Sequence, residues 1–284
     1  MLDLILVIAG GLWFAQLPTT GPPAAGPPAT ASPVNEPPMP DAAALMKEVQ
    51  AHQEKMDEVR ENYTFHRIRR VEELDGKGVV KKTTIQEREV FYVNGRQIAR
   101  LVKRDETPLS EADDKKEQDR VRKLTMEFSK KPPSFGRGGR INLINIILAV
   151  SEVSNPRRTQ MNGRSTLVFD FKGDPKAEAH GMEEKGARKV EGTVWIDEAD
   201  RQVARLEVEF YDNFRIAGGL LASIQKGTVM KIEQSPIGEG LWMPSVNEQH
   251  MNLRVIVKGV HENTQVTNFD FKRFNAEAAP SAPK

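Results

Sequence analysis

The chain has 284 residues, and its 41 Lys and Arg residues nearly balance its 40 Asp and Glu residues, for a formal net charge of +1. That balance excludes a protein-wide basic surface for nucleic acid. The chain has no Cys, which excludes disulfides, thiolate metal sites, a Cys nucleophile and a lipid-modified cysteine.

The composition of residues 1–40 is not typical of a folded domain. An apolar run from Leu4 to Ala15 has the length of an export signal and is shorter than the roughly 20 residues of a membrane span. We expect residues 1–17 to be an export signal, cleaved or kept as an anchor; a buried strand or helix is the alternative. Residues 18–40, rich in Pro, Ala and Gly, are predicted to be a linker, and residues 275–284 a disordered tail.

The remaining residues, 41–274, are predicted to form one domain. A helix start at Pro40-Asp41 precedes apolar residues at helical spacing. Alternating side chains then predict a strand over residues 63–70. Two further strands are predicted over 79–93 and 97–103, joined by the hairpin turn Asn94-Gly95, whose two positions favour positive φ.

Two helices of opposite character follow. Ser110 and Asp113 have capping-box spacing at the start of a charged helical insertion, at about residues 110–130. We expect it to project from the domain as a solvated helix; docking of a partner or a membrane surface is the alternative. Residues 141–150 are almost entirely apolar and too short to span a bilayer. They are expected to form a core helix, or a plug or lid inside a curved sheet.

The second half of the chain alternates apolar and polar residues along successive segments separated by turns such as Asn162-Gly163. This pattern predicts antiparallel strands with one wet face. A meander with one apolar concave face is the simplest assembly. The apolar residues around Gly218-Gly219 interrupt the pattern and are expected either to form a small lid or to fill the core.

Three local motifs suggest a family. They are the segment from Gly192 to Asp197 (GTVWID) with the amphipathic strand after it, the segment LWMPS at 241–245, and the closing NFDF at 268–271. In these features the sequence resembles the outer-membrane lipoprotein-sorting (LolA/LolB-like) superfamily. The resemblance implies a mainly antiparallel α+β fold, a curved half-barrel sheet with covering helices. It also implies an apolar cavity that takes a lipid or the acyl chain of a lipoprotein.

The candidate site is therefore the apolar inner face of the sheet together with the apolar residues that would cover it. The expected inner-face residues are Leu167, Phe169, Phe171, Val194, Ile196, Leu206, Val208, Phe210, Met230 and Ile232. The expected lid residues are Ile144, Ile147, Leu148, Phe214, Leu220 and Leu221.

Enzyme motifs are not evident in the sequence. The five His residues form no metal-binding motif, and there is no nucleophile elbow, P-loop or dinucleotide-binding loop. We therefore expect no catalytic residue, no metal and no cofactor. The expected protein is a non-enzymatic periplasmic or envelope protein, with a lipid or acylated lipoprotein as partner, no nucleic acid, and membrane association through the N-terminus. The alternative is a closed-core interaction or sensor module that docks an envelope protein through its charged helix.

Overall fold

The computed structural model describes residues 37–132, 143–216, 222–238, 240–255 and 258–274. Its elements are α2 (Ala42–Arg60), β1 (Tyr63–Leu74), β2 (Val80–Val93), β3 (Arg96–Arg104), β4 (Thr107–Pro108), α3 (Glu111–Ser129), α4 (Leu143–Ala149), β5 (Ser151–Met161), β6 (Arg164–Gly173), α5 (Met182–Ala187), β7 (Val190–Asp197), β8 (Val203–Phe210), β9 (Phe214–Ile216), β10 (Ala222–Ile224), β11 (Val229–Gly238), β12 (Leu241–Val255) and β13 (Lys258–Arg273). The predicted export segment, most of the predicted linker and the predicted tail lie outside the described residues.

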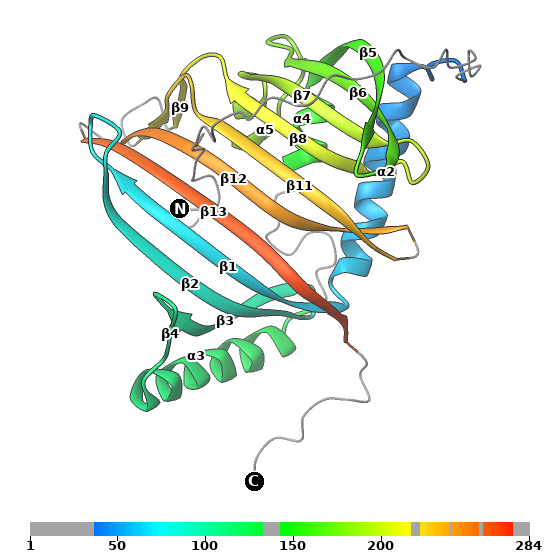
Figure 1. The fold of residues 1–284 in the computed structure, drawn as a ribbon. Helices are drawn as coiled ribbons and strands as arrows, with labels where there is room; N and C mark the ends of the chain where they lie inside the picture. The colour runs from blue at the N-terminus through cyan, green and yellow to red at the C-terminus, as the bar shows by residue number, and fades with distance from the viewer. Residues whose placement is uncertain (1–36, 133–142, 217–221, 239, 256–257, 275–284) are drawn as a thin grey trace, which may run out of the picture.

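The described strands form one antiparallel sheet (Figure 1). Its order is β4-β3-β2-β1-β13-β12-β11-β8-β7-β6-β5, and the short hairpin of β9 and β10 joins β12 through β10. Most neighbours are also neighbours in sequence, as a meander requires. Three contacts are not: β1 pairs with β13, β8 pairs with β11, and β10 pairs with β12. The first and last long strands therefore meet in the middle of the sheet, which the expected simple meander does not include.

Tight turns fix the register of the hairpins. In the turn between β2 and β3, φ is 49° at Asn94 and 75° at Gly95, and in the turn between β5 and β6 it is 52° at Asn162 and 76° at Gly163. Positive φ at both central positions is the geometry that matches the twist of the flanking strands. Both predicted hairpin turns are confirmed.

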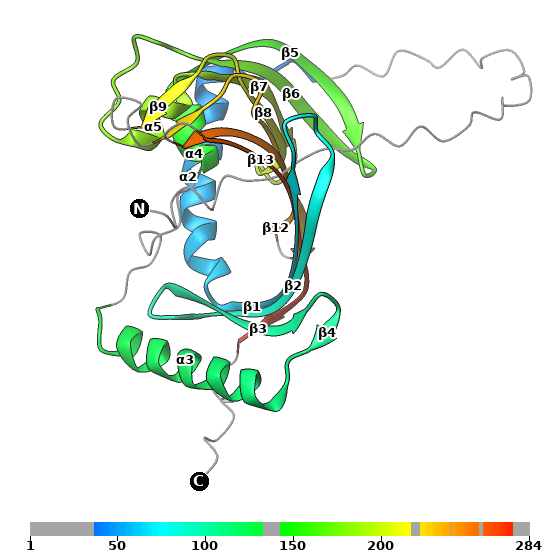
Figure 2. The ribbon, with the colours of Figure 1, turned by 90° about the vertical axis from the view of Figure 1, so that its left-hand side faces the viewer.

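The sheet is curved, and α2 runs across its open side (Figure 2). Asp41 caps this helix by accepting a hydrogen bond from the backbone N–H of Ala44 at 2.8 Å. Leu45, Met46 and Val49 of α2 are buried against the sheet. The fold is thus a curved sheet with covering helices, as the family resemblance implies.

The main core lies between α2, α4 and the strands from β6 to β8, with contributions from β11 and β12. A second, smaller cluster contains Phe65, Val90 and Met243, with Tyr92 and Phe271 packed against it. Polar side chains separate the two clusters on the same face of the sheet, because the cross-strand pairs of β1 and β2 change from Phe65–Val90 to Arg67–Arg88. The concave face is therefore apolar over only part of its area, and the expectation of one continuous apolar face is wrong.

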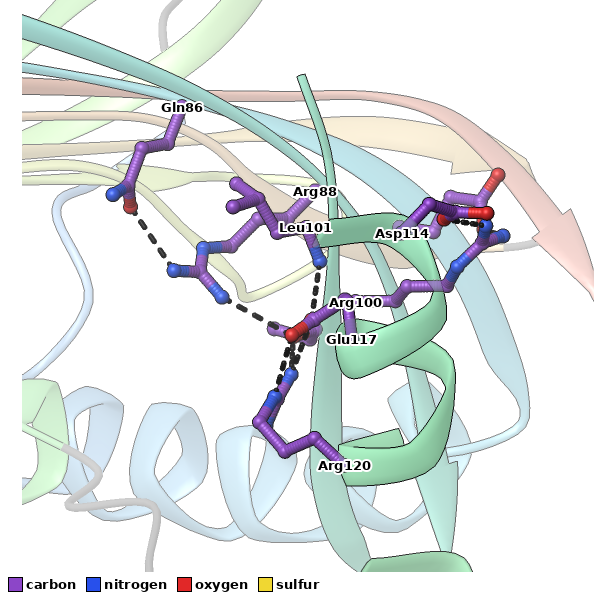
Figure 3. Close-up of polar contacts among 9 residues, drawn as sticks. Gln86, Arg88, Arg100, Leu101, Asp114, Glu117 and Arg120 are labelled. Carbon is purple, nitrogen blue, oxygen red and sulfur yellow. Dashed lines mark hydrogen bonds and ion pairs between the residues drawn. The ribbon is translucent and has the colours of Figure 1, made fainter. Parts of the chain in front are cut away.

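Helix α3 does not project from the domain as expected. Its predicted cap is confirmed, since the Ser110 hydroxyl accepts a hydrogen bond from the N–H of Asp113 at 3.2 Å. The helix lies along β3 at one end of the sheet, held by charged side chains, and none of its residues is buried (Figure 3). The distribution of apolar and charged residues alone predicts a solvated helix here. It takes no account of contacts between the carboxylates of the helix and the edge of a strand.

Candidate ligand-binding face

The sheet register brings the predicted inner-face residues together. Phe169 of β6 pairs with Val194 of β7, Val194 pairs with Leu206 of β8, and Leu206 pairs with Ile232 of β11. Paired residues of antiparallel strands point to the same face. Nine of the ten predicted residues are buried, and Ile232 is half-buried. All ten lie in or against the main core, on the face that α2 and α4 cover.

One glycine shapes this face. A Cβ added at Gly192 would lie 2.9 Å from the ring of Phe171 and 1.9 Å from the carbonyl oxygen of Glu207. Phe171 and Val208 are its partners on the neighbouring strands. The missing side chain therefore leaves the space that the Phe171 ring and the backbone of Glu207 occupy, and the GTVWID motif has a packing role at its first residue.

The predicted lid residues that the structure describes also lie in this core. Ile144, Ile147 and Leu148 of α4 are buried, and so is Phe214 of β9. Leu220 and Leu221 lie outside the described residues. Helix α4 contacts α2, and the side-chain amide of Asn145 donates a hydrogen bond to the carbonyl oxygen of Gln50 at 3.3 Å. In this conformation α2 and α4 cover the apolar part of the concave face.

Helix α2 is fastened to the sheet near its C-terminal end. The guanidinium of Arg60, only 3 % exposed, donates to the carbonyl oxygen of Trp242 at 2.8 Å and to the side chain of Gln234 at 2.5 Å. The side chain of Gln53 donates to that of Gln202 at 3.1 Å. These buried hydrogen bonds tie α2 to β11, β12 and the turn before β8.

The second motif, LWMPS, joins a polar cluster at the turn between β7 and β8. Arg164 makes a two-pronged ion pair with Asp197, at 2.5 and 2.9 Å, and also contacts Asp200 at 2.7 Å. The guanidinium lies over the ring of Trp242, whose indole N–H donates to Asp200 at 2.9 Å. Burial raises the pKa of Asp197, but hydrogen bonds from Arg164 and from the backbone of Asp200 outweigh it and hold that pKa below its usual value.

The other part of the concave face is polar and was not anticipated. Arg67 and Arg69 of β1 point to it, as does Arg88 of β2, which lies directly opposite Arg67. The sequence carried a signal, because Arg67 and Arg69 share one phase of β1 with Phe65 and Val71, which also face this side. The signal was weak, since Tyr63, Phe65 and Val71 give this phase only one more apolar residue than Ile68 and Leu74 give the opposite phase.

A pocket of about 210 Å³ opens beside Arg69. Arg69, Thr84 and Gln86 line it, together with Val71, Glu73 and Glu262. The Glu262 carboxylate lies 3.4 Å from Arg69, and Glu73 lies 3.7 Å from Lys82. The pocket is therefore polar, unlike the apolar cavity that the resemblance implies.

Two absences hold for the described part of the chain. Within it, no group of three or more His, Asp or Glu side chains is placed to hold a metal ion. Among the described helices, none is both long enough and apolar enough to cross a membrane.

Comparison with known proteins gives structural likenesses at low sequence identity. No family model matches the chain, and no curated protein does. The chain is similar to an outer membrane lipoprotein-sorting protein domain from Vibrio parahaemolyticus (11% identity, TM-score 0.36, 81% of this chain and 94% of that one). It is also similar to a LolA superfamily protein from Nitrosomonas europaea (10% identity, TM-score 0.32, 79% and 92%). The fold class stated above rests on the sheet of this chain and not on these likenesses.

Proposed function

We propose that the protein is a non-enzymatic envelope protein that binds an acyl chain, of a lipid or of a lipoprotein, on the apolar part of its concave face. In this proposal α4 is a plug, and the described conformation is the ligand-free one. The observation that carries the proposal is the placement of Ile144, Ile147 and Leu148. These side chains belong to a seven-residue helix and pack against the apolar face. An acyl chain bound on that face would have to take their place.

The exchange of plug for ligand is energetically feasible. Burying a side chain such as Ile or Leu contributes about 1.5–3 kcal/mol, and each buried CH₂ of an acyl chain contributes about 0.8 kcal/mol. An acyl chain that takes the place of three such side chains therefore recovers the burial that they lose. A near-neutral exchange suits a carrier, because the loaded and empty states then differ little in free energy and either can be populated.

The contrast with α2 supports α4 as the movable part. Moving α2 would break the buried hydrogen bonds of Arg60 and Gln53, and buried polar groups left without partners cost about 1–3 kcal/mol each. Displacing α4 breaks mostly apolar contacts. The ligand restores those contacts, whereas it cannot restore the hydrogen bonds of α2.

The envelope location is part of the same proposal. The apolar run from Leu4 to Ala15 supports it, because it has the composition and length of an export signal. Transport of a lipid or lipoprotein between membranes would require such export.

A second function has a specific observation in its favour. The apolar inner-face residues are buried, and the exposed helix α3 carries Met126 at 51 % exposure among its charged residues. In this alternative the core stays closed, and α3 docks an envelope protein.

Native mass spectrometry on the full chain purified from an envelope fraction, followed by lipid extraction, separates the two functions. The proposal predicts a co-purified acylated species, or its uptake when monopalmitoylglycerol is added. A mass that remains that of the bare chain after this addition would contradict the carrier function and favour the docking module.

A further inference from the structure

The arginines on the polar part of the concave face lie where repulsion between like charges should destabilise the sheet. Arg67 and Arg88 lie directly opposite each other on β1 and β2, and Arg69 lies two residues along β1 on the same face. Like charges that lie directly opposite in a sheet destabilise it. A structural role alone would favour a carboxylate at one of these positions, as at the Lys103–Glu87 pair on the other face.

Arg88 has no carboxylate within ion-pair distance among the residues that the structure describes. It donates to the carbonyl oxygen of Ala99 at 3.2 Å and to the side chain of Gln86 at 3.0 Å (Figure 3). Burial lowers the pKa of Arg88, Glu117 raises it, and Arg120, Arg69 and Arg104 lower it further. The guanidinium is therefore half-buried, with three arginines and one carboxylate close enough to shift its pKa.

Arg69 is only partly compensated. Its side chain is 25 % exposed, and the Glu262 carboxylate lies 3.4 Å away, which is long for a charge-assisted hydrogen bond. Burial lowers the pKa of Arg69 more than Glu262 raises it. Gln86 links the two arginines, because it lies opposite Arg69 in the register and accepts from Arg88.

The acidic groups nearby do not cancel this charge. Glu262 pairs with Arg69, and Glu73 pairs with Lys82 at the far end of the pocket. Glu117 accepts from Arg120 and from the backbone of Leu101. Among the described residues, Glu262 is the one carboxylate within ion-pair distance of Arg69 or Arg88.

We propose that Arg69 and Arg88, with Arg67 beside them and the polar pocket as the entrance, bind a phosphate group, as a monoester or a diester. A phosphate has several acceptor oxygens and up to two negative charges, so it can bridge guanidinium groups of adjacent strands and remove their repulsion. A carboxylate has fewer acceptor oxygens and carries less negative charge.

The source of the phosphate is a lipid headgroup or a free phosphate. The headgroup reading rests on the proposed function, because the arginines share the concave face with the apolar part. An amphiphile could then place its acyl chain under α4 and its phosphate on β1 and β2.

The test compares two probes with the same acyl chain, palmitoyl lysophosphatidate and monopalmitoylglycerol, and adds inorganic phosphate alone. Binding to the full chain is measured by calorimetry, with Arg69→Gln, Arg88→Gln and the control Arg70→Gln, which lies on the opposite face of β1. We expect lysophosphatidate to bind at least tenfold more tightly than the glycerol lipid. Each of the two inward variants should remove most of this difference, and the control should keep it.

Each outcome decides between the two proposals. Equal binding of both lipids overturns the phosphate site and leaves the acyl-chain function standing. Binding of inorganic phosphate without either lipid, lost in Arg69→Gln and Arg88→Gln, supports the site and contradicts the acyl-chain function. No binding of any probe overturns both. Thermal denaturation adds an independent readout: Arg88→Gln should keep or raise Tm if repulsion dominates, and a lower Tm together with unchanged binding would mark Arg88 as structural.

Discussion

The carboxylate of Glu117 in α3 accepts a hydrogen bond from the backbone N–H of Leu101 in β3 at 2.7 Å (Figure 3). Two residues earlier, the carbonyl oxygen of Ala99 accepts from Arg120 of the same helix at 2.7 Å. Glu117 and Arg120 also pair with each other. The helix thus occupies outward-facing backbone groups of β3 that a further strand would otherwise pair with, and an open edge of that kind invites aggregation.

Replacing Glu117 by Ala should loosen α3 from the sheet. The substitution removes a charge-assisted acceptor, and such hydrogen bonds contribute about 1.5–3 kcal/mol. Hydrogen exchange should become faster at Leu101 and throughout α3. Self-association should also rise with protein concentration, because the edge of β3 is open. The control is Glu111→Ala, at the exposed first position of α3; equal exchange in the two variants would contradict this role of Glu117.

Acid should release the same contact. The hydrogen bond from Arg120 holds the pKa of Glu117 below its usual value, although partial burial acts against it. A carboxylate whose pKa is lower in the folded state stabilises that state above its unfolded pKa of about 4.3, and the contribution is lost as pH falls through the folded value. Exchange in α3 should therefore accelerate below about pH 4 while β6–β8 stay protected. Glu117→Gln should flatten this pH dependence, and an unchanged profile would contradict the assignment.

The ion pair of Arg164 and Asp197 should contribute far more to the free energy of unfolding than ion pairs on the surface do. Asp197 is 1 % exposed, so Asp197→Asn weakens charge-assisted bonds in a buried site and should cost about 2–3 kcal/mol. Thermal denaturation should show a Tm lower by roughly 4–12 °C. Asp170→Asn, which alters a more exposed pair with Arg157, should cost less than about 1 kcal/mol. Equal shifts in the two variants would be the opposite result.

Substitutions at two buried isoleucines distinguish a loss of packing from a change in ligand binding. Ile147 of α4 and Ile98 of β3 are each 1 % exposed, so Ile→Ala at either position should destabilise the fold by about 2–5 kcal/mol. Only Ile147→Ala weakens the plug on the apolar face. It should therefore bind monopalmitoylglycerol more tightly than the wild type does, whereas Ile98→Ala should not. If the affinity for the lipid changed equally in both variants, α4 would be an ordinary core helix and not a plug.

Local features of this fold could be predicted from the sequence. The Asn94-Gly95 and Asn162-Gly163 turns, the Asp41 and Ser110 caps and the alternation of the later strands depend on neighbouring residues, so a single segment suffices to find them. The ten inner-face residues share one phase because their strands alternate cleanly. The burial of Phe171 against Gly192 follows from the same alternation, although the clash that a side chain at 192 would cause does not.

Long-range features could not be predicted in this way. The pairing of β1 with β13 joins residues about two hundred positions apart, and no local pattern encodes it. Without that pairing, the phase of β1 stays ambiguous, so the inward direction of Arg67 and Arg69 stays hidden. The contact of Glu117 with β3 has the same cause: a charged helix looks solvated until the strand edge beside it is known.

Hydrogen exchange of α4 with and without monopalmitoylglycerol tests the central claim most directly. If an acyl chain takes the place of Ile144, Ile147 and Leu148, saturating lipid should accelerate exchange in residues 143–149 while β6, β7 and β8 keep or gain protection. If saturating lipid binds and α4 keeps its protection, the ligand lies elsewhere and α4 is not a plug.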